Sequence, residues 1–392
     1  MRVLIAVLVL WLAGLGAAAQ FGKLSFSLDL IAARYPLAGP VALGLVLSVV
    51  GLVGLVFGTT AGLLVARIGP RRALTAALAL GAGLSALQSL PLPYGLMMLS
   101  RVLEGVSHLA IVVVGPVLIA GITPPRHQGL AMTLWSSFFG VTYAGLALLA
   151  PALLRHGLPG LFMPHAALML ALALVLGRLL PADPPPPKRD RQGGLLRQHL
   201  EIYASPRLAA PALGFVNYTA IYVAALTLLP PALPGAQVGL LAVGMPLISI
   251  LASLTLGVWA LRRMAAVRLV QAGFGLGGVA AVGLWWVWGH DGGLGAAKDG
   301  AMLVLGLVFA AAMGIVQGAS FASIPELNAT AEDRARAAGA VAQLGNLGTT
   351  TGTPILAFLL AQWGGTGFLV FALPLCLSGI GIHAWQARRR GG

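Results

Sequence analysis

Three ionisable residues interrupt one of the long apolar segments of this sequence. Arg101, Glu104 and His108 follow one another at intervals of three and four residues within the apolar segment 95–122. At about 100° per residue they occupy a wedge of roughly 60° on one side of a helix. Because ionisable groups inside such a segment are costly, these residues are candidates for binding a solute or carrying a proton.

The first apolar segment, residues 3–32, repeats this spacing with Gln20, Lys23 and Ser27. These three residues also share one face of a helix. We therefore predict two polar stripes, one on each helix, that face the interior of the protein or a water-filled cavity.

The charges of the two stripes do not cancel. Lys23 and Arg101 outweigh Glu104, so the site carries a charge of +1 and prefers an anion. We predict that Gln20, Lys23 and Arg101 contact an anionic solute. Glu104 and His108 would exchange a coupling proton, since the reference pKa of His lies near physiological pH. The alternative is a structural network in which Glu104 only neutralises its cationic neighbours and His108 only packs.

The elements that position these residues follow from composition. Of 392 residues, 58% are hydrophobic and 9% are charged, whereas about 25% of an ordinary soluble domain is charged. The apolar runs approach the roughly 20 residues that cross a bilayer as a helix. We therefore predict an all-α polytopic membrane protein. Its twelve spans are 3–32, 40–66, 73–91, 95–122, 129–153, 160–181, 207–230, 236–261, 269–289, 301–323, 337–362 and 367–386.

The net charge of +14 indicates how the chain lies in the membrane. With twelve spans, 19 of the 24 Lys and Arg residues fall on the side of both termini and three on the other side. Cytoplasmic loops carry such an excess, so both termini are predicted to be cytoplasmic. The cations form no stripe with interleaved aromatic residues, which argues against nucleic-acid binding. Ala17-Ala18-Ala19 imitates a cleavage site for a secretory signal, but the charge distribution favours an intact first span.

The longest polar segment, residues 182–206, divides the sequence into two sets of six spans. We predict an N-terminal bundle over 1–181, a cytoplasmic linker with a short amphipathic helix over 182–206, and a C-terminal bundle over 207–392. Gly62-LLVA-Arg67 after the second span and Gly257-VWAL-Arg262 after the eighth share one spacing. Such internal repeats are common in secondary transporters.

The segment Gly62-LLVARIGPRRA-Leu74 resembles the signature that the major facilitator superfamily carries between its second and third spans. Ala66 stands where the family usually has Asp, so the ion pair that this Asp makes cannot form here. Arg101-VLE-Gly105 is similar to a second element of the family. The resemblance implies a role in conformational gating for Gly62, Arg67, Gly69 and Arg71.

Within this superfamily, Gln343-LGNLGTTTGTP-Ile355 looks most like bacterial transporters grouped with cyanate and nitroimidazole carriers. Gly140-VTYAGL departs from the G-x-x-x-G-P signature of many drug/proton antiporters, because Ala144 and Gly145 replace its final Gly and Pro. The resemblance therefore implies a location in the bacterial inner membrane and lowers the expectation of a drug antiporter.

By family position, spans 1 and 4 line a central cavity and spans 7 and 10 face them across it. The resemblance therefore implies that spans 7 and 10 form the side of the solute site opposite the charged residues, and that this side is uncharged. The candidates on spans 7, 10 and 11 are Asn217, Tyr218, Tyr222, Gln317 and Asn346. Trp135 on span 5 is a candidate for an aromatic wall of the site. For each of them alone, packing is the alternative.

Rival classes lack their characteristic residues. No H-x-x-x-H pair or G-x-x-x-x-G-K-[ST] loop occurs, so neither a metalloenzyme nor a nucleotide-driven pump is predicted. We predict no enzymatic activity, no cofactor and a monomer in the lipid bilayer. The predicted function is proton-coupled secondary transport of a small organic solute by alternating access, most readily an anion and by symport. A drug or metabolite efflux antiporter and a facilitated uniporter are the alternatives.

Overall fold

The fold is described here from a computed structural model of the chain. The structure describes residues 2–58, 60–124, 131, 134–135, 137–183, 195–233, 236–289 and 296–391. All regular structure within these residues is helical. Contacts divide the chain into two compact units. Unit 1 comprises residues 1–38 and 49–192, and unit 2 comprises residues 39–48 and 193–392.

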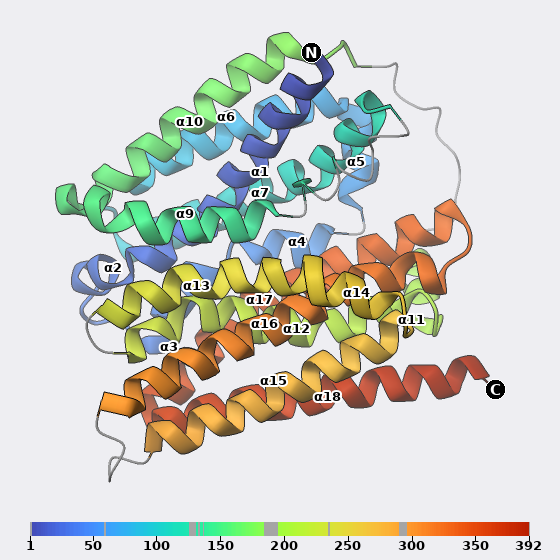
Figure 1. Ribbon diagram of the computed structural model, residues 1–392. Coiled ribbons are helices and arrows are strands. Elements are labelled where there is room, and N and C mark those ends of the chain that lie inside the picture. Colours follow the sequence, from blue (N-terminus) through green and yellow to red (C-terminus); the bar gives the residue numbers. More distant parts are fainter. Residues whose placement is uncertain are drawn as a thin grey trace. The chain divides into compact units, whose positions relative to one another are not determined.

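Unit 1 is built from long apolar helices that share one core. Its helices are α1 (Arg2–Phe26), α2 (Leu28–Arg34), α4 (Gly51–Phe57), α5 (Ala61–Ile68), α6 (Pro70–Gln88), α7 (Tyr94–Ile122), α9 (Phe138–Leu153), the 3-10 turn η1 (Leu154–His156) and α10 (Gly157–Leu179). Buried residues of α1, α6, α7 and α10 form a continuous apolar cluster, which includes Leu10, Leu78, Ile111 and Met169. Figure 1 shows α6 and α10 lying side by side. These four helices also position the ionisable residues of the first and fourth predicted spans.

Unit 2 contains the remaining helices. They are α3 (Pro40–Ser48), α11 (Leu195–Ala204), α12 (Ala209–Leu228), the 3-10 turn η2 (Pro230–Ala232), α13 (Ala236–Ala252), the π-helical turn η3 (Ser253–Gly257), α14 (Val258–Leu261), α15 (Ala266–Gly289), α16 (Ala296–Leu327), α17 (Ala331–Trp363) and α18 (Gly365–Gly391). α12 packs against α17, and α15 packs against both α16 and α18.

The described residues contain eight helices that are long and apolar enough to cross a membrane, or nine when the bent pair α3–α4 counts as one span. The run Phe138–Leu179 counts once among them, although it covers α9, a turn and α10. Gly157 makes that turn with φ +70°, a conformation that other residues rarely adopt. α6 and α17 are also long, but they are more polar and are not among these eight helices. The start of the fifth predicted span, 129–153, lies outside the described residues. The all-helical prediction is confirmed.

The structure interrupts the first two predicted spans. The first, 3–32, ends as a straight helix at Phe26, and a turn at Ser27 leads into α2. The second, 40–66, breaks between α3 and α4. No proline or polar run marks this break in the sequence. α3 instead packs against α17, and the Ser48 hydroxyl donates to the carbonyl of Thr350 at 2.8 Å.

Both copies of the internal repeat are largely helical rather than loops. Gly62-LLVA-Arg67 lies in α5, and residues 258–261 of the second copy form α14. In the first copy, Gly69 with φ +97° ends α5, and in the second copy Arg262 follows the end of α14.

The predicted linker over 182–206 lies partly outside the described residues, but its short helix is α11. The Tyr203 hydroxyl donates to the Gln343 side-chain oxygen at 2.7 Å, and His199 Nε2 lies 3.1 Å from the same oxygen. Burial raises the pKa of Tyr203 to about 12, so this hydroxyl stays a hydrogen-bond donor even in alkaline solution. α11 is therefore attached to α17 through polar contacts.

Candidate functional site

A network of buried charges lies inside unit 1, where α1, α6, α7 and α10 meet. Glu104 on α7 joins two cations. Its Oε1 lies 2.6 Å from Lys23 Nζ on α1, and its Oε2 pairs with Arg101 one turn earlier on its own helix. All three side chains are fully buried. The two polar stripes predicted from spacing therefore contact each other through this carboxylate.

α6 and α10 supply further polar groups to the network. The Gln88 amide donates to Glu104 Oε2 at 2.9 Å, so the carboxylate accepts from three side chains. Lys23 Nζ also donates to Ser85 Oγ at 3.0 Å and lies 4.9 Å from the ring centroid of Phe162. Buried charges persist where their hydrogen bonds are satisfied in this way.

The other predicted residues of the stripes extend the network along α1. Arg101 donates to the backbone carbonyl of Gln20 at 2.7 Å, and the Gln20 side-chain amide donates to Ser107 at 2.9 Å. His108 Nδ1 lies 3.0 Å from the carbonyl of Ala17. A carbonyl oxygen only accepts, so Nδ1 of His108 carries a proton.

His165 on α10 was missed by the sequence reasoning. Its Nε2 lies 2.9 Å from the carbonyl of Gly16, and its Nδ1 lies 2.9 Å from Ser85 Oγ, to which Lys23 also donates. The Ser85 hydroxyl has one proton and a second acceptor in reach, the carbonyl of Phe162 at 3.0 Å. His165 is therefore neutral if Ser85 donates to it, and doubly protonated if Ser85 donates to Phe162.

A signal for His165 was present in the sequence. It is an ionisable residue inside the predicted span 160–181, which alone makes it a functional candidate. Ser85 and Gln88 carry no comparable signal, because polar uncharged residues are common on helices that pack together in membranes. Only the packing of α6 against α7 and α10 brings them to the charges.

The predicted residues of unit 2 form no charged counterpart within the described part of the chain. Tyr218 and Tyr222 are buried on α12 with their rings stacked at 5.6 Å, and the Tyr222 hydroxyl donates to the carbonyl of Met245 at 3.0 Å. The side-chain amides of Asn217 and Asn346 donate to carbonyls of their own helices. Gln317 on α16 is half-buried.

Trp135 contributes to packing within unit 1. It is buried in the apolar cluster and lies 5.1 Å from the ring of Phe138. Gly115 on α7 leaves room for its ring, because an added Cβ there would meet the indole.

The signature segment between α5 and α6 is held by an acidic residue from elsewhere in unit 1. Asp183 accepts hydrogen bonds from the backbone N–H groups of Arg71 and Arg72 at 2.7 and 3.1 Å. The Arg71 side chain donates to the carbonyl of Gly177. Asp183 thus places a carboxylate at the N-terminus of α6, where the helix dipole favours a negative charge. Gly62 and Arg67 lie in α5, but their surroundings are outside the described part of the structure.

Replacing Asp183 tests this contact. We expect Asp183→Ala to lower the free energy of unfolding by about 1 kcal/mol, because two N–H groups of α6 lose their acceptor. Thermal unfolding of the purified protein in detergent measures the effect. Asp29→Ala, at an exposed position in the first turn of α2, is the matched control. Equal melting temperatures for both variants would contradict the assignment.

The described residues form helices, eight or nine of them long and apolar enough to cross a membrane, and buried charges lie between four helices of unit 1, which is typical of a polytopic membrane protein. The sequence profile of the Major Facilitator Superfamily matches residues 10–331. The chain belongs to the major facilitator superfamily of transporters.

The fold is also seen in a solved structure. A bacterial homologue of the human lysosomal transporter Spinster, crystallised in an inward-facing and unoccupied conformation, matches with a TM-score of 0.69. The match covers 98% of this chain and 95% of that chain, at 14% sequence identity. A comparison with curated protein sequences finds no match. The major facilitator fold is thus established, whereas the class of solute has to be inferred from the residues of the site.

Proposed function

We propose that this protein is a secondary active transporter that moves a small organic anion by alternating access, driven by protons. The observation that carries this proposal is the buried network in which one carboxylate joins two cations. In the proposed arrangement, the bundles 1–181 and 207–392 move about a central site and 182–206 links them. We further propose a monomer in the bacterial inner membrane, with both termini cytoplasmic.

The preference for an anion rests on charge balance. Lys23 and Arg101 exceed Glu104 by one positive charge in a place that is fully buried. An uncompensated charge is costly in such surroundings. A carboxylate or similar group of the solute would supply the missing negative charge, with Gln20 beside it. Asn217, Tyr218, Tyr222, Gln317, Asn346 and Trp135 are proposed for the uncharged wall. The resemblance to the cyanate and nitroimidazole carriers agrees with a small solute and stays a prediction.

The proposed coupling route uses Glu104 and His108. A proton that binds Glu104 weakens its attraction for Lys23 and Arg101 and leaves both cations for the solute. Proton binding and anion binding then favour each other, which is the requirement for symport. Gly62, Arg67, Gly69 and Arg71 are proposed to act in gating.

A facilitated uniporter is the second candidate, and a specific observation favours it. Glu104 already accepts from Lys23, Arg101 and Gln88. All three donors bind the ionised form of the carboxylate, and two of them are charged. If Glu104 keeps these three hydrogen bonds throughout the transport cycle, the network is structural and transport is not coupled to protons.

Transport into proteoliposomes separates these candidates. We expect a panel of radiolabelled mono- and dicarboxylates to include at least one whose uptake an imposed proton gradient accelerates. Lys23→Ala and Arg101→Ala should reduce its uptake at least tenfold. Glu104→Gln and His108→Ala should abolish the response to the gradient but retain exchange of solute across the membrane. Activities are normalised to the folded protein recovered.

Exposed residues of the same types provide matched controls for this experiment. Arg178 and His156 are exposed in unit 1, so Arg178→Ala and His156→Ala should transport normally. Near-normal transport in all four variants of the network would refute the proposed site. Transport that never responds to a proton gradient would establish the uniporter instead.

A further inference from the structure

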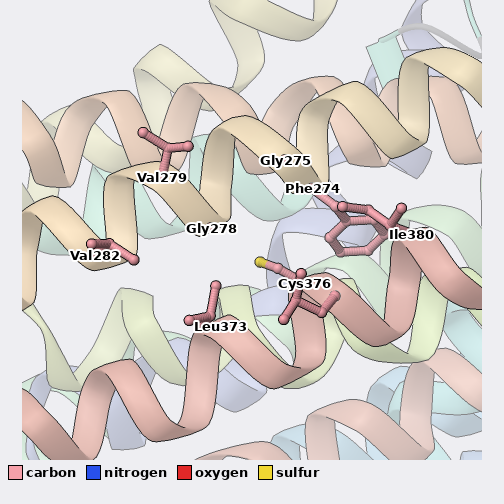
Figure 2. A pocket seen from close by; sticks show the side chains of 9 residues that line it. Phe274, Gly275, Gly278, Val279, Val282, Leu373, Cys376 and Ile380 are labelled. Carbon is pink, nitrogen blue, oxygen red and sulfur yellow. The ribbon is translucent and has the colours of Figure 1, made fainter.

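An apolar groove runs between α15 and α18 on the surface of unit 2 (Figure 2). We call it the α15–α18 groove; Gly275, Gly278 and Val282 of α15 and Leu373, Leu377 and Ile380 of α18 are among the residues that line it. Its volume is about 280 Å³. The groove is independent of the buried charges in unit 1.

The groove exists because two of the residues that line it, Gly275 and Gly278, are glycines without side chains. A Cβ added to Gly275 would meet nothing within 4 Å, and one on Gly278 would make only ordinary contacts with Leu373 and Cys376. The two helices are joined on either side of this opening. Gln271 donates to the carbonyl of Ile380 at 3.1 Å, and Trp285 donates to the Thr366 hydroxyl at 3.1 Å.

The apolar lining and the exposure of the groove suit a segment of a lipid tail. The residues of α15 that line the groove run from Phe274 to Val282, eight positions along the chain, which is roughly 12 Å along the helix. Val279 and Leu377 at the opening are 70% and 58% exposed, so this face meets the surrounding membrane. Both helices are long and apolar enough to span it.

Two exposed arginines lie beyond one end of the groove. The pairs Gln271–Ile380 and Trp285–Thr366 show that α15 and α18 run antiparallel, so α15 begins where α18 ends. Arg268 lies about 20° around α15 from Gly275 and roughly 10 Å beyond it. Arg388 lies about 20° around α18 from Leu377. Both arginines are exposed, and each continues the stripe of its helix that lines the groove.

We propose that the α15–α18 groove binds one anionic phospholipid. An acyl chain lies in the groove, and the phosphate lies near Arg268 and Arg388, at the membrane surface where α15 begins. Basic residues between helices at the cytoplasmic surface attract anionic headgroups. This leaflet is the cytoplasmic one in the orientation proposed above. A second copy of this chain fits the groove less well, because a parallel two-fold axis would bring the arginines of both copies together.

Lipid binding to the purified, delipidated full-length protein tests this proposal. Native mass spectrometry would compare phosphatidylglycerol with phosphatidylcholine carrying the same acyl chains. We expect one tightly held phosphatidylglycerol, bound roughly thirty-fold more strongly than phosphatidylcholine, because each arginine near a membrane surface contributes about 1 kcal/mol. Gly275→Leu should weaken this binding at least tenfold. Arg268→Gln combined with Arg388→Gln should remove the preference and spare the weaker binding.

Gly83→Leu is the matched control, since Gly83 on α6 is also exposed with open space for a side chain. It should leave phosphatidylglycerol binding unchanged. Equal affinities for the two lipids, or binding that Gly275→Leu does not weaken, would overturn the proposal. A dimer that Gly275→Leu disrupts would assign the groove to a second copy and also overturn it. The proposal would also be overturned if inorganic phosphate bound at the two arginines as strongly as the lipid. None of these outcomes depends on whether the protein transports an anion.

Discussion

Replacing Glu104 by Gln is expected to lower the free energy of unfolding by about 3–5 kcal/mol, because it leaves two buried cations without an anion. Glu104 is the carboxylate that joins Lys23 to Arg101, and all three side chains are fully buried. Gln keeps the size of the side chain and loses only the charge. The melting temperature of the purified protein in detergent should fall accordingly.

Lys23→Met should cost much less, although it removes a partner of the same carboxylate. The pair Arg101–Glu104 remains and is electrically balanced, so the loss is limited to the hydrogen bonds of Lys23, about 1–2 kcal/mol. Adding Lys23→Met to Glu104→Gln should then recover part of the stability, since one unpaired cation is buried instead of two. This order of stabilities among the three variants follows from the number of buried charges left unpaired in each.

A double-mutant cycle on Lys23 and Glu104 measures this coupling directly. If Lys23→Met destabilises the protein as much as Glu104→Gln, the network is held by packing rather than by charge balance. If the stability lost in the double variant equals the sum of the two single losses, the two side chains act independently. Either result would contradict the net positive charge on which the preference for an anion rests.

Gly352→Leu is expected to disrupt the packing of α12 against α17 in unit 2. A Cβ at Gly352 would meet backbone atoms of Ala220 on α12, and one at Gly348 would meet the backbone at Val216. Backbone atoms cannot move aside as a flexible side chain does, so the two helices must separate. Overpacking in a core costs about 1–3 kcal/mol or more, and in a membrane close approach through small residues is a main source of helix association.

The yield of monodisperse protein and its melting temperature measure this effect. Gly239→Leu is the control in the same unit, because Gly239 is exposed on α13 and has open space around it. We expect Gly239→Leu to behave like the unmodified protein and Gly352→Leu to lose most of its folded yield. A Gly352→Leu variant with unchanged stability would show that α12 and α17 do not approach as closely as the structure indicates.

Most of the architecture could be predicted from the sequence, because a bilayer makes local composition decisive. Apolar runs with few charges have to form helices there, since backbone groups find no water to bond. The ends of the helices were less predictable. Next to the break between α3 and α4, α3 packs against α17, more than 300 residues away along the chain, and no proline or polar run marks this position in the sequence.

The sequence by itself determined the class of the protein and the costly charges at Lys23, Arg101 and Glu104, because charge inside an apolar segment is visible without any fold. Tertiary structure alone decided their partners. Ser85, Gln88 and His165 joined the network, and Asp183 came to the N-terminus of α6, through contacts between helices far apart in the chain. The rotation of each helix about its axis sets such contacts, and long-range packing fixes that rotation.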